Sequence, residues 1–385
     1  MEIRILQLIK GLDIGNRSGG SDKFGLELTK ALKHSGAQVC LGVLNTFGTE
    51  IEKLKIIELE KLSIPVVFIE GRNTLTKINS PQLANYCIQN GIGIINSHFQ
   101  VGTLAAIRAR EFGYAGKVAR TAHIDKEWGD GILSWILRQV FTKHIFPLCT
   151  DLQVGVSQNI VDTINHYPGT RQSGKKAVVI HNGILQEWFQ PTPVRKLPGD
   201  ARKVIGAIGL LIKRKGFHFL IAAMPRVLMK YPHCELVIAG EGPYRAVLEK
   251  QILHLGLQDH VRLIGNQPDP RSCLEKMDLF VLPSLVEGLP TVIIESMARG
   301  VPVVASDIPG NNELVVNGKT GWLFRSRSDE DLAKIIVKAF SDPLLSKDIS
   351  AQAYSWALNL TIQNAVKQYI EQYEQLFKDQ DQDSL

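Results

Sequence analysis

The feature that most constrains this fold is a regular alternation of short apolar runs with helical patterns, which occurs twice along the chain. The first half predicts a helix at 24–34, ended by Gly36, and strands at 3–9, 39–44, 65–69, 92–96, 117–122, 152–156 and 177–180. The second half predicts helices at 217–230 and 244–255, and strands at 204–210, 234–239, 261–264, 279–283 and 302–305. Such alternation indicates parallel sheets covered by helices. The sequence therefore predicts an α/β protein with two doubly wound sheets.

A change of composition marks the expected boundary between two domains. The chain has 385 residues, more than one hydrophobic core usually supports, so two domains with a ligand cleft between them are expected. The stretch QPTPVRKLPGD at 190–200 contains three prolines and a glycine, which is a linker composition. We therefore expect domains at 1–190 and 191–360, and a C-terminal helix at 361–385 that packs back on the first domain.

Charge and cysteine content narrow the class of protein. The net charge is +6, but no basic stripe interleaved with aromatic residues is visible, so nucleic acid is not an expected partner. The five cysteines form no CxxC pair, which fits a reducing cytoplasm better than a disulfide or zinc framework. No signal peptide is apparent, and no apolar stretch reaches the roughly 20 residues of a spanning helix. We expect a cytoplasmic protein that is soluble or lies on a membrane without crossing it.

The most informative motif is DLFVLPSLVEGLPTVIIESMARG at 278–300, where a buried strand, a loop and a helix opened by Pro290 follow one another. Glu287 lies in the loop and Glu295 one turn into the helix. The amides of 288–291 occupy the helix N-terminus, whose unpaired N–H groups and partial positive charge hold phosphate. Two carboxylates beside a bound diphosphate can accept hydrogen bonds from hydroxyls, which suits a nucleotide sugar. The competing interpretation makes Glu287 a helix-flanking acid and Glu295 an exposed helix residue.

The two glutamates with seven residues between them, and the sequence that continues to GNNELVVNGKTGWLF, resemble the GT-4 family of retaining glycosyltransferases. Other matching segments are IGLLIKRKGF and VIAGEGP in the second half, and Gly19-Gly20, the His98 and His123 segments, VGVSQ and HNGI in the first. The resemblance implies the GT-B architecture, in which two Rossmann-like domains face one another across a cleft. It also implies that 1–190 serves the acceptor and that 191–360 binds a nucleotide-sugar donor.

The resemblance implies a role for each matching residue. Glu287 would hold hydroxyls of the donor sugar, Glu295 would bind the ribose, and Lys215 would neutralise the diphosphate. His123 would join Glu287 and Lys215 as the catalytic set. The backbone around sugar and phosphate would come from Gly288, Leu289, Pro290 and Thr291.

One position departs from the family pattern. The family commonly has glycine, arginine and leucine ahead of the lysine, whereas this chain has Gly209, Leu210 and Leu211. Gly209 remains a candidate donor contact, but one of the two cations that share the charge of the leaving phosphate is missing. Arg214 and Lys213 are candidates to replace it, although an arginine fork and a lysine point charge are not interchangeable.

Two segments of the first domain are further candidates. Gly19 and Gly20 lie between a strand and a helix, where missing side chains let the backbone approach a donor, although an ordinary turn fits equally well. His123 follows a predicted strand, at the sheet edge where ligands bind, and matches the family's histidine beside the donor sugar. The competing interpretation is a structural histidine. His98 has a similar place and is the weaker candidate.

The segment KEWGDGILSWILRQVFTKHIFP at 126–147 mixes aromatic and basic side chains. A helix of this composition can lie in a membrane interface. An ordinary helix packed on the sheet is the preferred interpretation. The terminal DQDQDSL resembles a metal-binding DxD, but a solvated chain end is the expected state.

These features together predict the reaction. A retaining glycosyltransferase would move a sugar from a UDP-sugar or GDP-mannose to a glycan or lipid-linked glycan, as in polysaccharide or lipopolysaccharide biosynthesis. No metal and no cofactor are expected, because Lys215 and a helix terminus would neutralise the diphosphate. The alternatives are an inactive nucleotide-sugar-binding scaffold, which the missing arginine favours, and a GT-B nucleotide-sugar epimerase.

Overall fold

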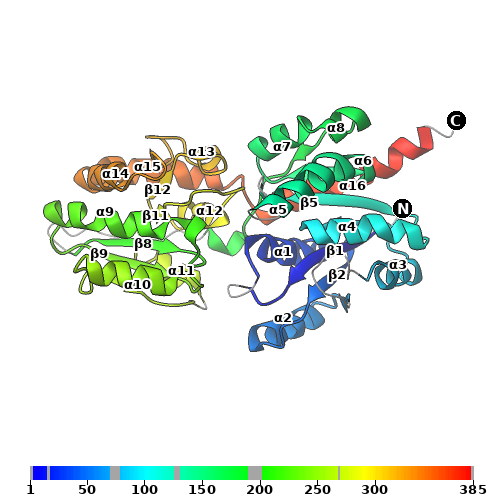
Figure 1. Ribbon diagram of the computed structural model, residues 1–385, viewed down its shortest axis with the longest axis horizontal. Coiled ribbons are helices and arrows are strands. Elements are labelled where there is room, and N and C mark those ends of the chain that lie inside the picture. Colours follow the sequence, from blue (N-terminus) through cyan, green and yellow to red (C-terminus); the bar gives the residue numbers. More distant parts are fainter. Residues whose placement is uncertain are drawn as a thin grey trace. The chain divides into compact units, whose positions relative to one another are not determined.

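The computed structural model describes residues 3–14, 18–69, 79–124, 131–189, 202–267 and 269–382. The chain divides into two compact units, one formed by Met1–Gly183 with Ile362–Leu385 and the other by Ile184–Thr361. The proline-rich stretch at 190–200, where the sequence predicts the boundary, lies outside the described residues. Each unit is built on a parallel sheet with helices, which confirms the predicted α/β class (Figure 1).

The first unit contains a seven-stranded parallel sheet in the order β3-β2-β1-β4-β5-β6-β7. Its strands are β1 Arg4–Gly11, β2 Gln38–Asn45, β3 Val66–Phe68, β4 Ile94–Ser97, β5 Lys117–Ala122, β6 Leu152–Gly155 and β7 Val178–Val179. All of them were predicted, with ends that differ by at most two residues. In the central pair Ile5 lies opposite Val39, and the side chains of β1 and β2 are buried in runs rather than alternately. Burial on both faces is what helix-covered parallel strands require.

The second unit contains a six-stranded parallel sheet in the order β10-β9-β8-β11-β12-β13. Its strands are β8 Val204–Ile208, β9 Glu235–Ala239, β10 Val261–Leu263, β11 Leu279–Leu282, β12 Val303–Ser306 and β13 Trp322–Phe324. The edge strand β13 was not predicted, because a three-residue apolar run shows no periodicity. Pairing with β12, in which Val304 lies opposite Trp322, makes this run a strand.

Helices cover both sheets (Figure 1). Those of the first unit are α1 Gly20–His34, α2 Glu50–Lys61, α3 Ser80–Gln89, α4 Gln100–Ala109, α5 Ile132–Leu137, α6 Phe146–Cys149, α7 Gln158–Asn165, α8 Pro168–Ser173 and α16 Ile362–Gln382. Those of the second are α9 Phe217–Lys230, α10 Arg245–His254, α11 Pro270–Leu274, α12 Thr291–Ala298, α13 Asn311–Leu314, α14 Asp329–Ser341 and α15 Pro343–Ala357. Helix α9 has the predicted bounds, whereas α1 begins earlier than predicted because Gly19 is its N-cap residue.

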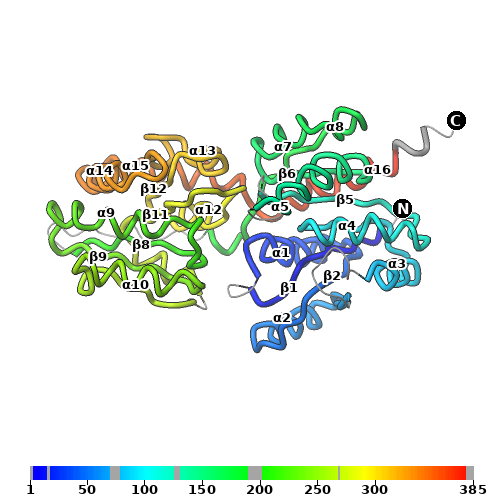
Figure 2. Tube along the Cα trace, in the orientation of Figure 1, coloured from blue at the N-terminus to red at the C-terminus, as the bar shows by residue number. Residues whose placement is uncertain are grey.

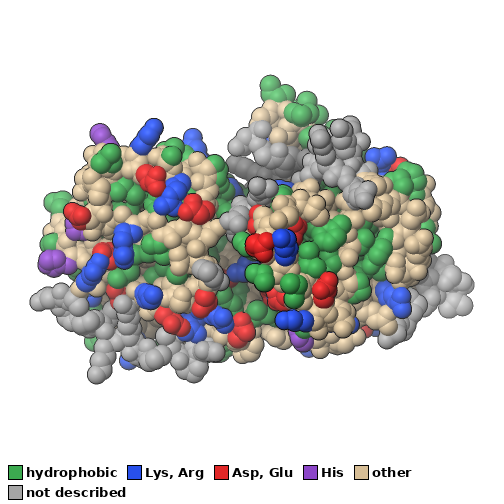
Figure 3. All heavy atoms as spheres, turned by 90° about the horizontal axis from the view of Figure 1, so that it is seen from below, with side chains coloured by type: hydrophobic (Ala, Val, Ile, Leu, Met, Phe, Trp, Pro, Cys, Tyr) green, Lys and Arg blue, Asp and Glu red, His purple; other side chains and the backbone are tan. Residues whose placement is uncertain are grey.

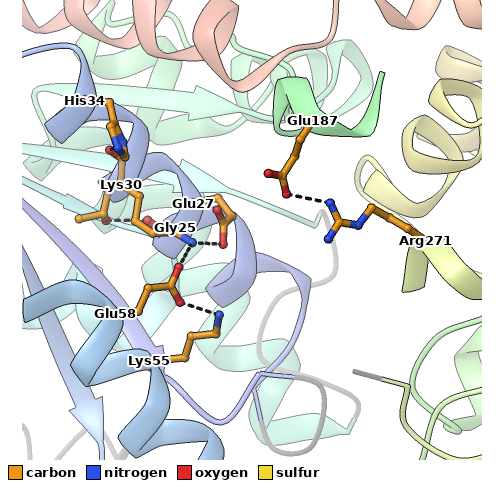
Figure 4. Close-up of polar contacts among 9 residues, drawn as sticks. Gly25, Glu27, Lys30, His34, Lys55, Glu58, Glu187 and Arg271 are labelled. Carbon is orange, nitrogen blue, oxygen red and sulfur yellow. Dashed lines mark hydrogen bonds and ion pairs between the residues drawn. The ribbon is translucent and has the colours of Figure 1, made fainter. Parts of the chain in front are cut away.

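An ion-pair network fastens α2 to α1 (Figure 4). The Lys30 ammonium lies 2.7 Å from a carboxylate oxygen of Glu27 and 2.8 Å from one of Glu58, which also pairs with Lys55 at 2.8 Å. The Lys30 side chain is largely buried, so its charge depends on these carboxylates. Burial opposes ionisation of Lys30, but the two glutamates outweigh it and raise its pKa above the ordinary value.

A second ion pair in Figure 4 belongs to the second unit. Arg271, at the start of α11, lies 3.1 Å from a carboxylate oxygen of Glu187 in a short 3-10 turn, Gln186–Trp188. The same guanidinium lies 5.9 Å from the ring centroid of Trp188, within cation–π range. These contacts hold the first described residues of the second unit against α11.

The described surface mixes charges of both signs. On the face in view in Figure 3, Lys and Arg side chains are interspersed with Asp and Glu side chains. Examples in the second unit are the pairs Arg226 with Asp329 at 2.7 Å and Lys334 with Glu330 at 2.9 Å. Exposed pairs of this kind contribute little to stability because water and salt screen them, so they bear more on solubility than on the fold.

The C-terminal helix α16 is part of the first unit, although the second unit separates it in sequence from the rest (Figure 2). It buries Ile362, Ala365, Val366, Tyr369 and Tyr373, which recur at helical spacing. The Tyr369 ring lies 6.5 Å from the ring of Phe24 on α1. The helix continues to Gln382, so the first four residues of the DQDQDSL tail are helical, and its last three residues lie outside the described part.

The strand orders fix where ligands can bind. In both sheets the winding reverses between two adjacent strands, β1 and β4 in the first unit and β8 and β11 in the second. Loops that leave these strands diverge to opposite faces of the sheet, and the opening between them is the usual ligand site of such sheets. The candidate residues of the second unit follow β8 and β11, and those of the first follow β1, β4 and β5.

Candidate active site

Two loops of the second unit are packed backbone against backbone at this reversal point. The 3-10 turn Lys213–Lys215 follows β8, and the loop at 283–290 follows β11. The amide of Leu285 donates to the carbonyl of Arg214 at 2.7 Å. A Cβ atom on Gly216, whose φ is +68°, would lie 1.9 Å from the carbonyl oxygen of Pro283. Glycine at 216 is therefore required both by its backbone conformation and by the approach of the second loop.

The contact between these loops joins Lys215 to Glu287. The Lys215 ammonium donates to Oε1 of Glu287 at 2.6 Å, and the hydroxyl of Ser284 donates to the same oxygen at 2.6 Å. Only 14% of the lysine side chain and 8% of the glutamate side chain are exposed. Burial opposes ionisation of Glu287, but the charges of Lys215 and Arg214 and the two hydrogen bonds outweigh it, so its pKa is below the ordinary value.

Arg214 lies at the edge of this charge pair. One of its guanidinium nitrogens is 3.3 Å from the carbonyl oxygen of Val286 and 4.0 Å from Oε2 of Glu287. Its side chain is about half exposed, and Lys213 is also exposed, whereas Leu210 is partly buried. Arg214 is therefore the cation that the described residues place beside Lys215, and it lies four positions from Leu210. Gly209 follows β8 directly. A Cβ atom placed on this glycine would lie 3.6 Å from Cε of Lys215.

Helix α12 begins directly after the loop. Pro290 is its N-cap residue, and the proline side chain makes no capping hydrogen bond. Gly288, Leu289 and Pro290 are buried, and Thr291 is the first helical residue. The carbonyl of Gly288 would lie 2.3 Å from a Cβ atom on Gly310, so this loop is also held by close backbone packing.

Glu295 is buried, which contradicts the interpretation of this residue as an exposed helix residue. It lies on α12 in an unbroken buried run from Ile293 to Ala298. A carboxylate in such a run is retained at a cost in desolvation unless it is paired or binds something. The carboxylate of Glu295 is therefore held inside the fold and is not a solvated surface group.

In the first unit the structure brings the two candidate histidines together. Nδ1 of His98 and Nε2 of His123 are 3.0 Å apart, and Nε2 of His98 lies 2.8 Å from Oε1 of Gln7. His98 is buried and His123 half-buried, and the Phe24 ring packs edge-on against both. Burial lowers the pKa of His98 well below its usual value. Burial and the charge of Arg120 lower the pKa of His123 to about 3.

Gln7 is a site neighbour that the sequence analysis did not identify. It lies in the run RILQLIKG, on a strand whose other interior residues are almost all apolar. A polar side chain inside a buried strand needs a hydrogen-bonding partner, so the interruption of this run was a usable signal. What the sequence lacked was the identity of that partner.

The carboxylate of Asp22 stabilises the Gly19-Gly20 turn through hydrogen bonds to backbone amides. One carboxylate oxygen of this buried residue accepts from the amide of Lys10 at 2.8 Å, and the other from the amide of Gly19 at 3.3 Å. Among the residues that the structure describes, none comes within 4 Å of a Cβ atom placed on Gly19 or Gly20. The fold itself does not require glycine at either position, so the open space next to the turn is available to a ligand.

The segment at 131–149 exposes part of its apolar surface. It comprises α5, a π-helix from Arg138 to Ile145, and α6. Phe146 is buried, as the preferred interpretation of a packed helix requires. That interpretation is wrong for α5, where Ile132 is 82%, Leu133 69% and Trp135 57% exposed. Trp128 lies outside the described residues.

Within the part of the chain that the structure describes, no helix has the length and apolarity needed to span a membrane.

Comparison with solved structures identifies the class of fold. Anabaena HepE in complex with UDP-glucose superposes with a TM-score of 0.78 at 21% identity, covering 97% of this chain and 100% of that one. Sucrose-phosphate synthase from Thermosynechococcus elongatus gives 0.79 at 18% identity, covering 98% and 100%. The two Rossmann-like units therefore have the GT-B fold, as the sequence resemblance implies.

The sequence comparisons find similarity to glycosyltransferases. Residues 192–356, which are less than half of the chain, match the family described as Glycosyl transferases group 1. An uncharacterized glycosyltransferase of Haemophilus influenzae is 30% identical over 178 residues, or 46% of this chain and 50% of that protein. A GDP-mannose-dependent alpha-(1-6)-phosphatidylinositol monomannoside mannosyltransferase of Mycolicibacterium smegmatis is 28% identical over 228 residues, or 54% and 59%. The matches thus span about half the length of these relatives.

The lowered pKa of His123 predicts how stability depends on pH. The unfolded chain binds a proton at this residue near pH 6.5, whereas the folded chain does so only near pH 3. The contribution of neutral His123 to the free energy of unfolding is therefore fully present above pH 6.5. This contribution is lost as the pH falls below 6.5. Between pH 6 and pH 4 the difference in unfolding free energy between wild type and His123→Asn should change by about 1.4 kcal/mol per pH unit.

Chemical denaturation at several pH values measures this difference. The exposed residue His166 supplies the matched control variant, His166→Asn. A constant difference between wild type and His123→Asn over this pH range would contradict the prediction.

Proposed function

We propose that this protein is a retaining glycosyltransferase that transfers a sugar from a nucleotide-sugar donor to a glycan or lipid-linked glycan. The observation that carries the proposal is the buried Lys215–Glu287 pair beside the N-terminus of α12, at the reversal point of the second sheet. It lies within the segment that matches the glycosyltransferase family. Two relatives support the donor class, since HepE was solved with UDP-glucose and the mycobacterial enzyme depends on GDP-mannose.

The second unit would bind the donor through groups of complementary chemistry. Lys215 and the first amides of α12 would neutralise the diphosphate, and Arg214 would contribute a second positive charge. Glu287, kept ionised by its lysine, would accept hydrogen bonds from sugar hydroxyls, and Glu295 would accept from the ribose. The backbone of Gly288, Leu289, Pro290 and Thr291, and Gly209 at the end of β8, would line the site.

The first unit would supply His123 and the Gly19-Gly20 turn to the donor side of the reaction. In a retaining transfer of this kind, the acceptor hydroxyl attacks the anomeric carbon from the face that the diphosphate leaves. A bond forms between acceptor oxygen and anomeric carbon, the bond to the phosphate oxygen breaks, and that oxygen takes the acceptor's proton. No protein nucleophile is needed, so catalysis rests on positioning and on charge stabilisation of the leaving diphosphate. No metal ion is required in this proposal.

The exposed α5 surface supports a lipid-linked acceptor and peripheral contact with an anionic membrane. Ile132, Leu133 and Trp135 project from α5, and the following π-helix adds Arg138 and Lys143. Apolar side chains with neighbouring cations suit the boundary between acyl chains and negatively charged headgroups. The protein would then act in the cytoplasm at the inner face of a membrane, in the synthesis of a polysaccharide or lipopolysaccharide.

An inactive nucleotide-sugar-binding scaffold is the second candidate function, and Leu210 at the position of the family arginine is the observation that favours it. Donor turnover separates the two candidates, because a scaffold binds the donor without consuming it. A nucleotide-sugar epimerase has no comparable observation in its favour.

The experiment that tests the proposal is a thermal-shift screen against UDP, GDP, ADP and their common sugar conjugates. A ligand that binds only the folded state raises the melting temperature, by an amount that grows with its concentration relative to Kd. We expect shifts for one base only, and the same shifts and the same transfer rate in the presence of EDTA. No shift with any conjugate would contradict a donor site, and loss of activity with EDTA would contradict the metal-independent mechanism.

The two glutamates can be tested by isosteric substitution. Glu287→Gln and Glu295→Gln each remove a charge-assisted hydrogen bond to the donor, so each should reduce the transfer rate by at least about tenfold. The matched control is Glu249→Gln, an exposed residue of α10 in the same unit. Full activity in both site variants would refute the assignment.

The missing arginine can be restored. Leu210→Arg should lower the Kd for the donor if the site lacks a cation, and titration calorimetry measures this change. Leu253→Arg, on the exposed side of α10, controls for the added charge. An unchanged Kd would mean that Arg214 already supplies the second cation.

The membrane contact can be measured by sedimentation with vesicles. We expect the protein to bind phosphatidylglycerol vesicles more tightly than phosphatidylcholine vesicles. The double variant Ile132→Ser/Leu133→Ser should weaken this binding at least about tenfold, since it removes two apolar side chains that would enter the membrane. The control is Met229→Ser/Leu253→Ser, which removes two exposed apolar residues of the second unit. Equal binding of both double variants would exclude α5 as the contact surface.

A further inference from the structure

A continuous chain of buried polar side chains connects the C-terminal helix to His123. Its members come from β1, β4, β5, the residue that follows β4, and α16, so it crosses the middle of the first sheet. They are Gln7, Asn96, His98, Thr121, Tyr369 and Tyr373, each at most 3% exposed. Such a set is not needed to fill the core, because apolar residues of similar size would fill it without loss of hydration.

The first part of the chain runs from α16 across β5 to β1. The hydroxyls of Tyr369 and Thr121 are 3.1 Å apart. The Thr121 hydroxyl donates to Oδ1 of Asn96 at 3.1 Å, and Nδ2 of Asn96 donates to Oε1 of Gln7 at 2.9 Å. Since Thr121 gives its hydrogen to Asn96, it is the Tyr369 hydroxyl that donates to Thr121.

The second part connects the Gln7 amide to Tyr373 on one side and to the histidines on the other. Nε2 of Gln7 donates to the hydroxyl of Tyr373 at 3.3 Å, which leaves Oε1 facing Asn96 and His98. Nε2 of His98 lies 2.8 Å from this oxygen and 3.4 Å from Nδ2 of Asn96, which donates to Gln7 at the shorter distance of 2.9 Å. An amide oxygen can only accept, so the shorter contact of His98 assigns a hydrogen to its Nε2.

The hydrogen on one nitrogen then determines the tautomers of both rings. Burial lowers the pKa of His98, so the ring is neutral and its Nδ1 is an acceptor. The partner of that atom is Nε2 of His123 at 3.0 Å, which must therefore carry the hydrogen. His123 is also neutral, so its remaining nitrogen, Nδ1, has a lone pair and no hydrogen.

We propose that Gln7, His98 and Tyr373 are positioning residues that fix His123 as its Nε2–H tautomer and thereby present Nδ1 to the ligand as a hydrogen-bond acceptor. The ligand group at His123 is then a neutral donor, such as a sugar hydroxyl, and not a phosphate oxygen, which would need an N–H. The inference rests on the proposed function for the sugar, but the tautomer itself does not depend on it.

The same geometry gives α16 a role in the first unit beyond closing its core. The helix enters this unit after the whole second unit has been synthesised. Its Tyr369 supplies the hydroxyl at one end of the polar chain, and its Tyr373 supplies the hydroxyl that accepts from Gln7. Burial raises the pKa of Tyr369 and of Tyr373, so both keep their hydrogens. Docking of α16 is therefore required before Gln7 and the histidines have a unique set of hydrogen bonds.

The tautomers can be observed directly in the full-length protein. Long-range proton–nitrogen NMR of a sample labelled with 15N-histidine distinguishes a ring nitrogen that carries hydrogen from one that does not. Signals are assigned with His98→Asn and His123→Asn. We expect Nε2 protonated and Nδ1 unprotonated in both rings at pH 7. The reverse tautomer in both rings, or averaged signals from the two nitrogens, would overturn the proposal.

Two variants test the origin of the tautomer. Gln7→Leu removes the acceptor of His98, and Tyr373→Phe removes the hydroxyl that accepts from Gln7, so both should produce averaged nitrogen signals for His98 and His123. The matched control is Tyr354→Phe in the second unit, whose hydroxyl donates to the carbonyl of Phe189 at 3.5 Å. If Gln7→Leu fails to fold, the milder Tyr373→Phe variant still decides. Unchanged tautomers in folded Tyr373→Phe would overturn the positioning role.

Ligand titration separates this inference from the proposed function. We expect UDP-glucose or GDP-mannose to shift the Nδ1 signal of His123 and the corresponding diphosphate alone to leave it unchanged. A shift with the diphosphate alone would overturn the preference for a hydroxyl. If no nucleotide binds, the proposed function fails, whereas the tautomers measured in the unliganded protein still support or overturn the positioning role.

Discussion

Both sheets reverse their winding between two adjacent central strands, and the candidate site depends on that constraint. Because all strands are parallel, the loops after β8 and β11 leave the same edge of the sheet and turn to opposite faces. This is why Lys215 and Glu287, 72 residues apart, meet at 2.6 Å. The same reversal in the first sheet brings His98, after β4, into contact with Gln7 on β1. Each site is thus a direct product of strand order.

The two units keep their buried polar groups in different ways. Lys215 and Glu287 are both charged, and each compensates the desolvation of the other across a short contact. A diphosphate that approached Lys215 would find a cation whose position is already fixed. Burial keeps the rings of His98 and His123 neutral. Their hydrogen bonds therefore depend on which nitrogen donates and which accepts, and not on a net charge. The second unit therefore offers charge stabilisation, and the first offers selection of hydrogen-bonding groups.

The comparisons and the structure agree on where the chain is most constrained. The family match is confined to 192–356, whereas the fold match extends over nearly the whole chain. In the second unit, glycines at 216 and 310 allow backbone contacts that any side chain would prevent, so local sequence and local structure are closely coupled. The first unit also has a continuous parallel sheet, but its helix α5 exposes apolar side chains. An exposed surface of that kind places fewer steric requirements on its side chains than the packed loops of the second unit do.

The sequence by itself determined the α/β class, nearly every strand, and the motif that contains Glu287 and Glu295, because strand periodicity and helix N-termini are local properties of the chain. It did not determine β13, whose three residues become a strand only by pairing with β12. Tertiary structure also decided that Glu295 is buried, that α5 is exposed, and that Gln7 holds His98. These outcomes depend on which segments distant in sequence cover one another, and burial and hydrogen-bond partners are set by that packing.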